Sequence, residues 1–146
     1  MGVVTARALG VDLGSRRIGI ACSDPARIVA SPLVVLERAR RESDDHAAIL
    51  ALAREREADV VVVGLPLSLS GRRGPAARAA LAEIDRLRAA AAPSGIEVVA
   101  HDERLTTVTA ERSLAEAGMR PSRRRGVVDK VAAAVLLQAW LDGRRP

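Results

Sequence analysis

The sequence predicts an α/β protein with a five-stranded mixed sheet and helices on both faces. Short apolar runs typical of strands alternate with segments of helical periodicity. Residues 59–64 hold a β-branched, apolar run, which is typical of a central parallel strand covered on both faces. With 146 residues and 49% hydrophobic content, the chain can bury one core, so we expect one domain spanning residues 1–146.

The first part of the chain predicts an antiparallel meander followed by a helix. Residues 7–13 and 17–22 are apolar strands joined by a glycine-bearing turn, and residues 28–36 form a third strand that Pro32 interrupts. From 42 to 57, apolar positions recur near helical spacing with charges between them. This segment therefore predicts an amphipathic helix.

Proline and glycine mark the boundaries in the rest of the chain. The expected elements, in chain order, are the central strand at 59–64, a loop at 65–74, a helix from Pro75 to about Ala92, a strand at 96–100, a helix from Thr106 or Thr107 to Glu116, a basic loop at 120–126 and a last helix at 127–142, onto which Trp140 packs.

The charge and the aromatic content restrict the class of partner. The net charge is +5, and Lys130 is the one lysine among the 23 basic residues. Arginine suits phosphate because its fork of donors binds two oxygens at once. Aromatic residues make up 1% of the chain, which disfavours a protein that stacks bases on aromatic rings. We expect a nucleic acid held through its backbone.

Several features predict a soluble cytoplasmic protein with no membrane partner. No apolar run approaches the roughly 20 residues that span a bilayer. The first seven residues do not have the apolar stretch of a signal peptide. The single cysteine, Cys22, fits a reducing compartment and is expected to pack as a small hydrophobe.

Three acidic residues in unlike settings, Asp12, Glu103 and Asp129, suggest a metal-dependent nuclease. Mg²⁺ and Mn²⁺ take oxygen ligands, and carboxylates that face one point can hold such ions against a phosphodiester. Each acid also has a structural interpretation: Asp12 can accept bonds from turn amides, and the other two can complement helix dipoles. His46 and His101 do not form a zinc-binding spacing with Cys22.

Basic residues in the expected loops are candidates for contact with a nucleic-acid backbone, although solvated charge is the commoner role of such runs. Arg104 is either a phosphate clamp or a partner of Glu103, and Lys130 either steers phosphate or points to solvent. The loop candidates are Arg72, Arg73, Arg123, Arg124 and Arg125.

Four segments in order resemble the YqgF/RuvX family, the Holliday-junction-resolvase-like proteins also described as pre-16S rRNA nucleases. These segments are residues 12–19, Gly64-Leu65-Pro66-Leu67, residues 102–107, and Asp129 with Ala132 and Ala133. The resemblance implies a ribonuclease-H-like fold and a two-metal hydrolysis, with Asp12, Glu103 and Asp129 as catalytic residues and ligands of Mg²⁺ or Mn²⁺. It also implies substrate contacts from Ser15, Arg16, Arg17, Arg104, Thr106 and Thr107.

The family also orders the substrates: the 5′ end of precursor 16S rRNA comes first and a four-way DNA junction second. Symmetric junction cleavage would require a homodimer, and a monomer suffices otherwise. The chain departs from the family at Ser68 and Leu69, where Asn and Met are usual, and in the basic segment, where arginines replace the usual lysine. RuvC-type resolvases generally carry four acids, and Asp102 is an unconvincing fourth.

Two other classes remain open. The segment from Asp12 to Gly19 also resembles the first phosphate loop of actin-like and sugar-kinase ATPases, but those proteins use two such domains. A nucleic-acid-binding regulator without catalysis is the third class. Such a binder need not lose function when Asp12 becomes Asn.

Overall fold

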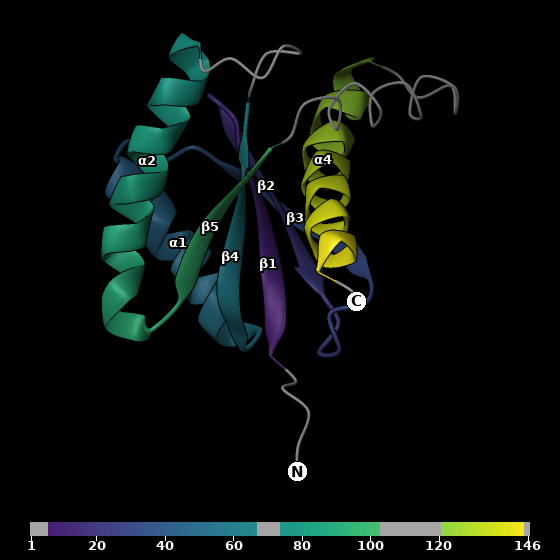
Figure 1. Cartoon of the computed structure of the whole chain (residues 1–146). Coiled ribbons are helices and arrows are strands. Elements are labelled where there is room, and N and C mark those ends of the chain that lie inside the picture. The colour runs from purple at the N-terminus through teal and green to yellow at the C-terminus, as the bar shows by residue number, and fades with distance from the viewer. Residues whose placement is uncertain (1–5, 67–73, 103–120, 145–146) are drawn as a thin grey trace.

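The five strands form one mixed sheet in the computed structural model, which describes residues 6–66, 74–102 and 121–144, the first ten residues of the last range as helical backbone only (Figure 1). The strands are β1 (Arg7–Leu13), β2 (Arg17–Ser23), β3 (Ala30–Glu37), β4 (Ala58–Leu65) and β5 (Glu97–Asp102). Their order is β3-β2-β1-β4-β5. The β1, β2 and β3 strands are antiparallel neighbours, whereas β4 runs parallel to both β1 and β5. The predicted mixed sheet and its central parallel strand are confirmed.

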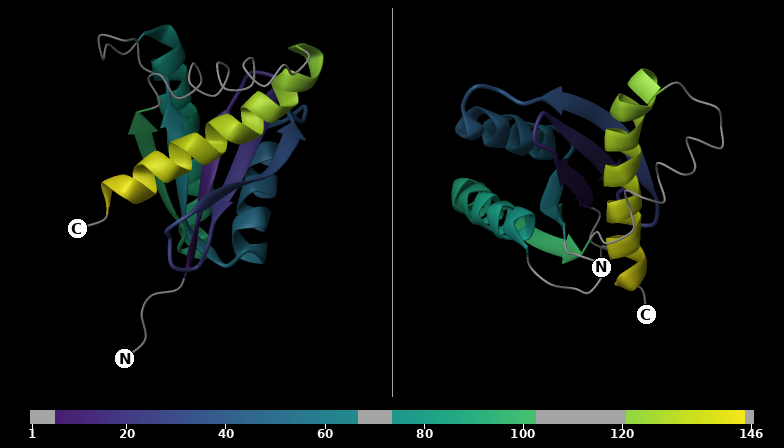
Figure 2. Two further views of the ribbon diagram at one scale, coloured as in Figure 1. Left: turned by 90° about the vertical axis from the view of Figure 1, so that its right-hand side faces the viewer. Right: turned by 90° about the horizontal axis from the view of Figure 1, so that it is seen from above.

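Helices cover both faces, as predicted. Helix α1 (Glu42–Glu55) and helix α2 (Pro75–Ala91), which continues into the short η1 (Ala92–Ser94), lie on one face. Helix α4 (Pro121–Gly143) crosses the other face (Figure 2). None of the helices in the described part of the chain is long and apolar enough to cross a membrane.

Strand alternation builds a different core on each face. Leu9 and Val11 of β1 pack with Ile49 and Leu87 from α1 and α2. The α4 face has smaller side chains, and Ala8 of β1 lies in a second buried cluster that includes Trp140, as expected for that tryptophan.

Gly10 explains why α4 approaches the sheet so closely. A Cβ at this position would lie 2.7 Å from the Cβ of Leu137 and 2.8 Å from the carbonyl oxygen of Ala133. Any other residue would push the helix away from β1.

Two expectations need correction. Pro32 does not interrupt the third strand, because β3 is an edge strand and the register shifts beside the proline, where Ile20 pairs with Val34 and Ala21 with Pro32. The prediction of a basic loop at 120–126 is wrong from residue 121 onward, because α4 begins at Pro121. Proline is favoured in the first turn of a helix, and arginine is a good helix former. The expected helix from Thr106 or Thr107 to Glu116 lies outside the described residues.

Candidate active site

The carboxyl ends of three parallel strands meet at one edge of the sheet. Val11 of β1 pairs with Val63 of β4, and Gly64 pairs with His101 of β5. Asp12 is one residue beyond Val11, so it lies level with Gly64 and His101 across the three strands. Open α/β sheets bind their ligands at this edge.

Asp12 and His101 lie on the same face of the sheet, the one that α4 covers. Side chains alternate along a strand, and Ala8, two steps along β1 from Gly10 and four from Asp12, packs in the cluster with α4. On β5, Val99 packs against that cluster, so His101 shares its face. Asp102 falls on the opposite face together with Val98. This position argues against Asp102 as a fourth acid of one site.

A tight turn places polar groups directly after Asp12. The N–H of Gly14 lies 3.2 Å from the carbonyl oxygen of Asp12 and 2.9 Å from that of Arg17, the second contact closing the turn. A Cβ on Gly14 would lie 2.5 Å from the Arg17 oxygen, so the turn requires glycine. The exposed Ser15 and Arg16 and the half-buried Arg17 line, with Gly14, a depression of about 210 Å³. Three predicted substrate contacts are therefore brought together beside Asp12.

The backbone of α4 brings the segment that contains Asp129 toward this edge. Ala133, whose carbonyl oxygen faces Gly10, follows Asp129 by four residues, or about one helical turn. Figure 2 shows the N-terminal part of α4 at the end of the sheet where β4 and β5 finish. Lys130 belongs to the same helix, as do the three arginines predicted in a loop, Arg123, Arg124 and Arg125.

Several predicted site residues lie outside the described part of the chain, so the structure does not test them. The position of Glu103 follows β5 directly, two residues after His101. The others are Arg72, Arg73, Arg104, Thr106 and Thr107.

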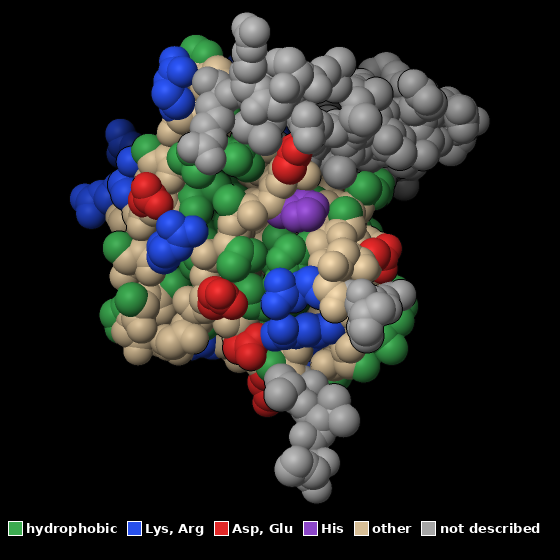
Figure 3. Space-filling model, in the orientation of Figure 1, with side chains coloured by type: hydrophobic (Ala, Val, Ile, Leu, Met, Phe, Trp, Pro, Cys, Tyr) green, Lys and Arg blue, Asp and Glu red, His purple; other side chains and the backbone are tan. Residues whose placement is uncertain are grey.

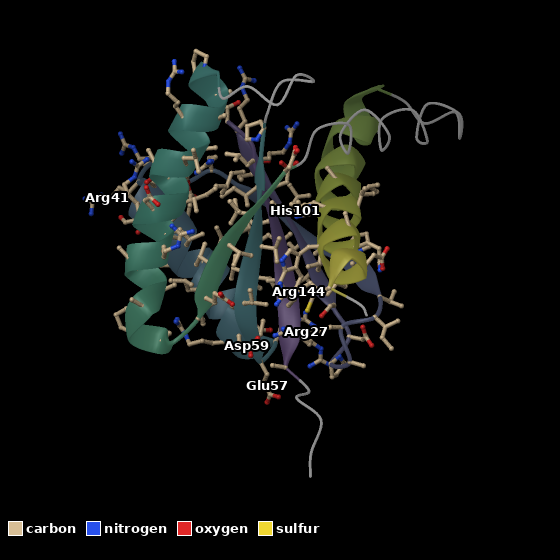
Figure 4. All side chains as sticks on the ribbon, viewed as in Figure 1. Arg27, Arg41, Glu57, Asp59, His101 and Arg144 are labelled. Carbon is tan, nitrogen blue, oxygen red and sulfur yellow. The ribbon has the colours of Figure 1, made fainter. Side chains whose placement is uncertain are left out.

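His101 is a candidate that the sequence analysis did not connect with Asp12. Figure 4 labels it near the end of β5 on the side of α4, and Figure 3 shows a histidine at the surface in the same place. Its side chain is half-buried. The two-residue period of the strand, counted forward from Val99, was the signal that could have found it.

A second polar cluster lies on the other face of the sheet, between α1 and α2. Nε2 of His46 lies 3.0 Å from Oε2 of Glu83. Burial alone would raise the pKa of Glu83, but hydrogen bonds from Arg38 and His46 hold it below its ordinary value. The sequence analysis missed this cluster because its members come from segments far apart in the chain.

The donor atoms of Glu42, His46 and Glu83 lie within 4.8 Å of one another, and their types are compatible with a divalent metal ion. Both carboxylates also have arginine partners. Glu42 accepts a hydrogen bond of 3.0 Å from Nη2 of Arg86, and Glu83 accepts two from Arg38. A cation at this position would compete with two guanidinium groups.

The strand order, the mixed pairing and the helices on both faces define the ribonuclease-H-like fold class. Here three antiparallel strands, β1 to β3, extend a parallel set of β1, β4 and β5, and helices cover both faces. The comparison with family models gives the particular group. The chain belongs to the RuvX family, whose description is Holliday junction resolvase and whose model matches residues 6–143.

Individual relatives agree with this assignment. A Mycobacterium ulcerans protein named "Putative pre-16S rRNA nuclease" is 50% identical over 145 residues, which cover 99% of this chain and 83% of that protein. RuvC of T. thermophilus, solved with a Holliday junction substrate, has a TM-score of 0.58 at 19% identity, with 95% of each chain covered. The yeast mitochondrial Holliday junction resolvase Ydc2 has a TM-score of 0.53 at 11% identity, covering 94% of this chain and 78% of that one. At these identities, the solved structures support the fold alone.

Proposed function

We propose that this protein is a metal-dependent endonuclease that hydrolyses phosphodiester bonds, with residues 1–146 forming one nuclease domain. The observation that carries the proposal is the placement of Asp12. Its position lies at the carboxyl end of β1, on the face covered by α4 and beside the depression lined by Ser15 and Arg16. Membership of the RuvX family supports the same chemistry.

Asp12, Glu103 and Asp129 are the proposed catalytic residues and ligands of Mg²⁺ or Mn²⁺. Asp12 lies at the carboxyl end of β1, and the helical period gives position 129 the same side of α4 as Ala133, while Glu103 lies outside the described residues. Carboxylate oxygens fit either ion. When bound, the ions supply an activated water and stabilise the leaving 3′ oxygen.

Three of the proposed substrate contacts follow Asp12 in the chain. Ser15 offers a hydroxyl and Arg16 a guanidinium at the rim of the depression, where a backbone phosphate would lie next to Asp12. Arg17 shares this lining. The remaining proposed contacts are Arg72, Arg73, Arg104, Thr106, Thr107, Arg123, Arg124, Arg125 and Lys130.

The proposed substrate is the 5′ end of precursor 16S rRNA, because that substrate gives the M. ulcerans relative its name. It would place the protein in the cytoplasm, and a monomer would be sufficient. The family description favours a second candidate, a four-way DNA junction, which would require a homodimer for paired cleavage.

Cleavage of labelled precursor rRNA and of a synthetic four-way junction tests the proposal. Each substrate is incubated with Mg²⁺, with Mn²⁺ and with a chelator, using wild type, Asp12→Asn and the matched control Asp59→Asn. Asp59 is exposed and pairs with Arg27 at the opposite end of the sheet (Figure 4). We expect metal-dependent cutting that Asp12→Asn abolishes and Asp59→Asn retains. Binding without cutting in any metal would instead identify a non-catalytic binder.

A further inference from the structure

One arginine joins the polar cluster between α1 and α2 to the turn beside Asp12. Nε of Arg38 donates a hydrogen bond of 2.9 Å to the carbonyl oxygen of Gly14. The backbone N–H of the same residue donates to the carbonyl oxygen of Arg16, also at 2.9 Å. Arg38 therefore contacts the turn through both its side chain and its main chain.

The other end of the guanidinium is held by two acids. Nη1 and Nη2 donate to the two carboxylate oxygens of Glu83 at 2.7 and 2.9 Å, and Nη1 also donates to Oδ2 of Asp45 at 3.1 Å. Glu83 comes from α2 and Asp45 from α1. The guanidinium thus connects both helices of one layer to a turn at the edge of the sheet.

The network is shielded, and its acceptors are satisfied. The side chains of Arg38, Asp45 and Glu83 are 18%, 4% and 10% exposed. Oδ1 of Asp45 accepts the N–H of Ala39 at 2.8 Å, and Oε2 of Glu83 also contacts His46. Every carboxylate oxygen of the two acids therefore has a donor. Such a network fixes one geometry, because any rearrangement leaves a buried charge unpaired.

We propose that Arg38 is a positioning residue that holds the Gly14–Arg17 turn, and with it Ser15 and Arg16, in the orientation that binds a backbone phosphate. This role rests on the proposed nuclease function. Arginine is required because its planar fork donates to Glu83 while Nε donates to Gly14. A lysine has a single terminal nitrogen, which cannot reach both partners in this geometry.

Hydrogen–deuterium exchange of the Gly14 backbone amide, measured by NMR, tests whether Arg38 holds the turn. This amide bonds inside the turn, to Arg17. In Arg38→Lys we expect it to exchange roughly tenfold faster, because the turn opens more often. Glu83→Gln keeps the shape and removes the charge, so it should change exchange in the same direction by less. Unchanged Gly14 exchange in both folded variants would overturn the proposal.

Two controls separate positioning from general loosening. Arg86→Lys alters an arginine on α2 that bonds to Glu42 and has no bond to the turn among the described residues, and it should leave Gly14 exchange unchanged. The amides of Ile28 and Val29 bond to Asp24 at the opposite end of β2, so they serve as internal references. If these amides accelerate as much as Gly14 does, Arg38 supports the whole fold and is not a positioning residue.

Kinetics test the functional half. We expect Arg38→Lys to raise KM about tenfold with a smaller change in kcat, because Ser15 and Arg16 bind the phosphate less well. A smaller amount of folded enzyme would lower kcat alone. If the turn loosens and KM stays at the wild-type value, the role of Arg38 in substrate positioning falls. If wild type cleaves nothing while Gly14 exchange responds as expected, the nuclease proposal fails and the support of the turn by Arg38 stands.

A metal ion is the competing occupant of the cluster. Titration with Zn²⁺ distinguishes a cluster held by Arg38 from a cluster that binds a metal ion. The titration is followed through the ring signals of His46 and the hydrogen exchange of the Gly14 amide. We expect stoichiometric Zn²⁺ to leave both unchanged, since Glu83 is already bonded to Arg38. If Zn²⁺ binds tightly, shifts the His46 ring signals and speeds hydrogen exchange at Gly14, the cluster is a metal site and the proposed role of Arg38 is wrong.

Discussion

Strand β2 connects two turns that are held in different ways. The turn after β2, residues 24–29, closes on itself. Oδ1 of Asp24 accepts the N–H groups of Ile28 and Val29 at 2.7 and 2.8 Å, and the N–H of Asp24 donates to Val29 at 3.1 Å. Arg27 adopts a φ of 57° within it. The bonds that close this turn thus come from one short stretch of sequence, and further bonds, among them those from Arg27 to Ala6 and from Gln138 to Ile28, link it to distant segments.

The turn before β2 depends on groups far away in the chain. It has its own bond from Gly14 to Arg17, but its carbonyl groups at Gly14 and Arg16 are bonded to Arg38. Arg38 depends in turn on Glu83, which is 45 residues further along. The comparison teaches that the turn beside the candidate active site is supported by one arginine that the packed helices hold, whereas the remote turn is closed by its own Asp24 and is linked to distant segments by other bonds. Functional loops are often positioned by a rigid scaffold in this manner.

The largest expected effect comes from removing the support. Glu83→Ala deletes both bonds to Arg38 and the bond to His46, and it leaves the shielded guanidinium with Asp45 as its remaining carboxylate partner. We expect the free energy of unfolding to fall by about 2–4 kcal/mol, measured by urea denaturation. Asp85→Ala on the same helix is the matched control, because Asp85 is exposed and bonds to Arg88. Equal losses in the two variants would contradict a special role for Glu83.

The same carboxylate gives the effect a pH dependence. The pKa of Glu83 is held below its ordinary value of 4.5, so the folded state favours the charged form. Its contribution is fully present above the unfolded pKa and is lost as the pH falls through the lowered folded value. The difference in stability between wild type and Glu83→Gln should therefore shrink as the solution is acidified below the ordinary value.

The second-largest effect is expected from a substitution within the turn. In Gly14→Ala, the new Cβ would lie 2.5 Å from the backbone oxygen of Arg17, and a backbone atom cannot rotate away as a side chain can. We expect a loss of about 1–3 kcal/mol in the free energy of unfolding. Gly143→Ala, where a Cβ has no heavy atom within 4 Å, should be close to neutral. A neutral Gly14→Ala would mean that the turn tolerates another conformation.

The elements of the fold were predictable where the pattern was local. The apolar runs of β1, β2 and β4 and the proline that opens α2 are each contained in their own segment. The start of α4 was not predictable in this way, because Gly126 and the run of arginines are typical of loops. Helix propensity of the arginines and the packing of the later turns against β1 outweigh that local signal.

The residues of the candidate site were likewise predictable only where they are close together in the sequence. Asp12, Ser15 and Arg16 were found because the strand and its turn are contiguous. Alternation along β5 contained the information about His101, but its use required knowing which face α4 covers. The bonds of Arg38 to Glu83 and Gly14 join three distant segments, so only the folded structure could reveal them.

A smaller effect is expected at the turn after β2. Asp24→Asn keeps the shape but weakens the acceptor, so the amides of Ile28 and Val29 should exchange several-fold faster while Gly14 stays unchanged. Hydrogen bonds from Val29 and Ile28 lower the pKa of Asp24. In wild type, the amides of Ile28 and Val29 are therefore protected from exchange above the pKa that Asp24 has in the unfolded chain. This protection is lost as the pH falls through the lower pKa of Asp24 in the folded state. A change in Gly14 exchange would show that the two turns are coupled through β2.

The smallest effect is expected at the edge of the supporting cluster. Arg86 bonds to Glu42, but its side chain is 56% exposed, so water can replace the guanidinium when it is removed. We expect Arg86→Ala to melt within about 2 °C of wild type and to leave Gly14 exchange unchanged. Measured beside Glu83→Ala, this variant separates charge at the rim from charge in the shielded part of the cluster. Faster hydrogen exchange at Gly14 in this variant would contradict the expectation. It would mean that the turn depends on Arg86 and Glu42 as well as on Arg38 and its two acids.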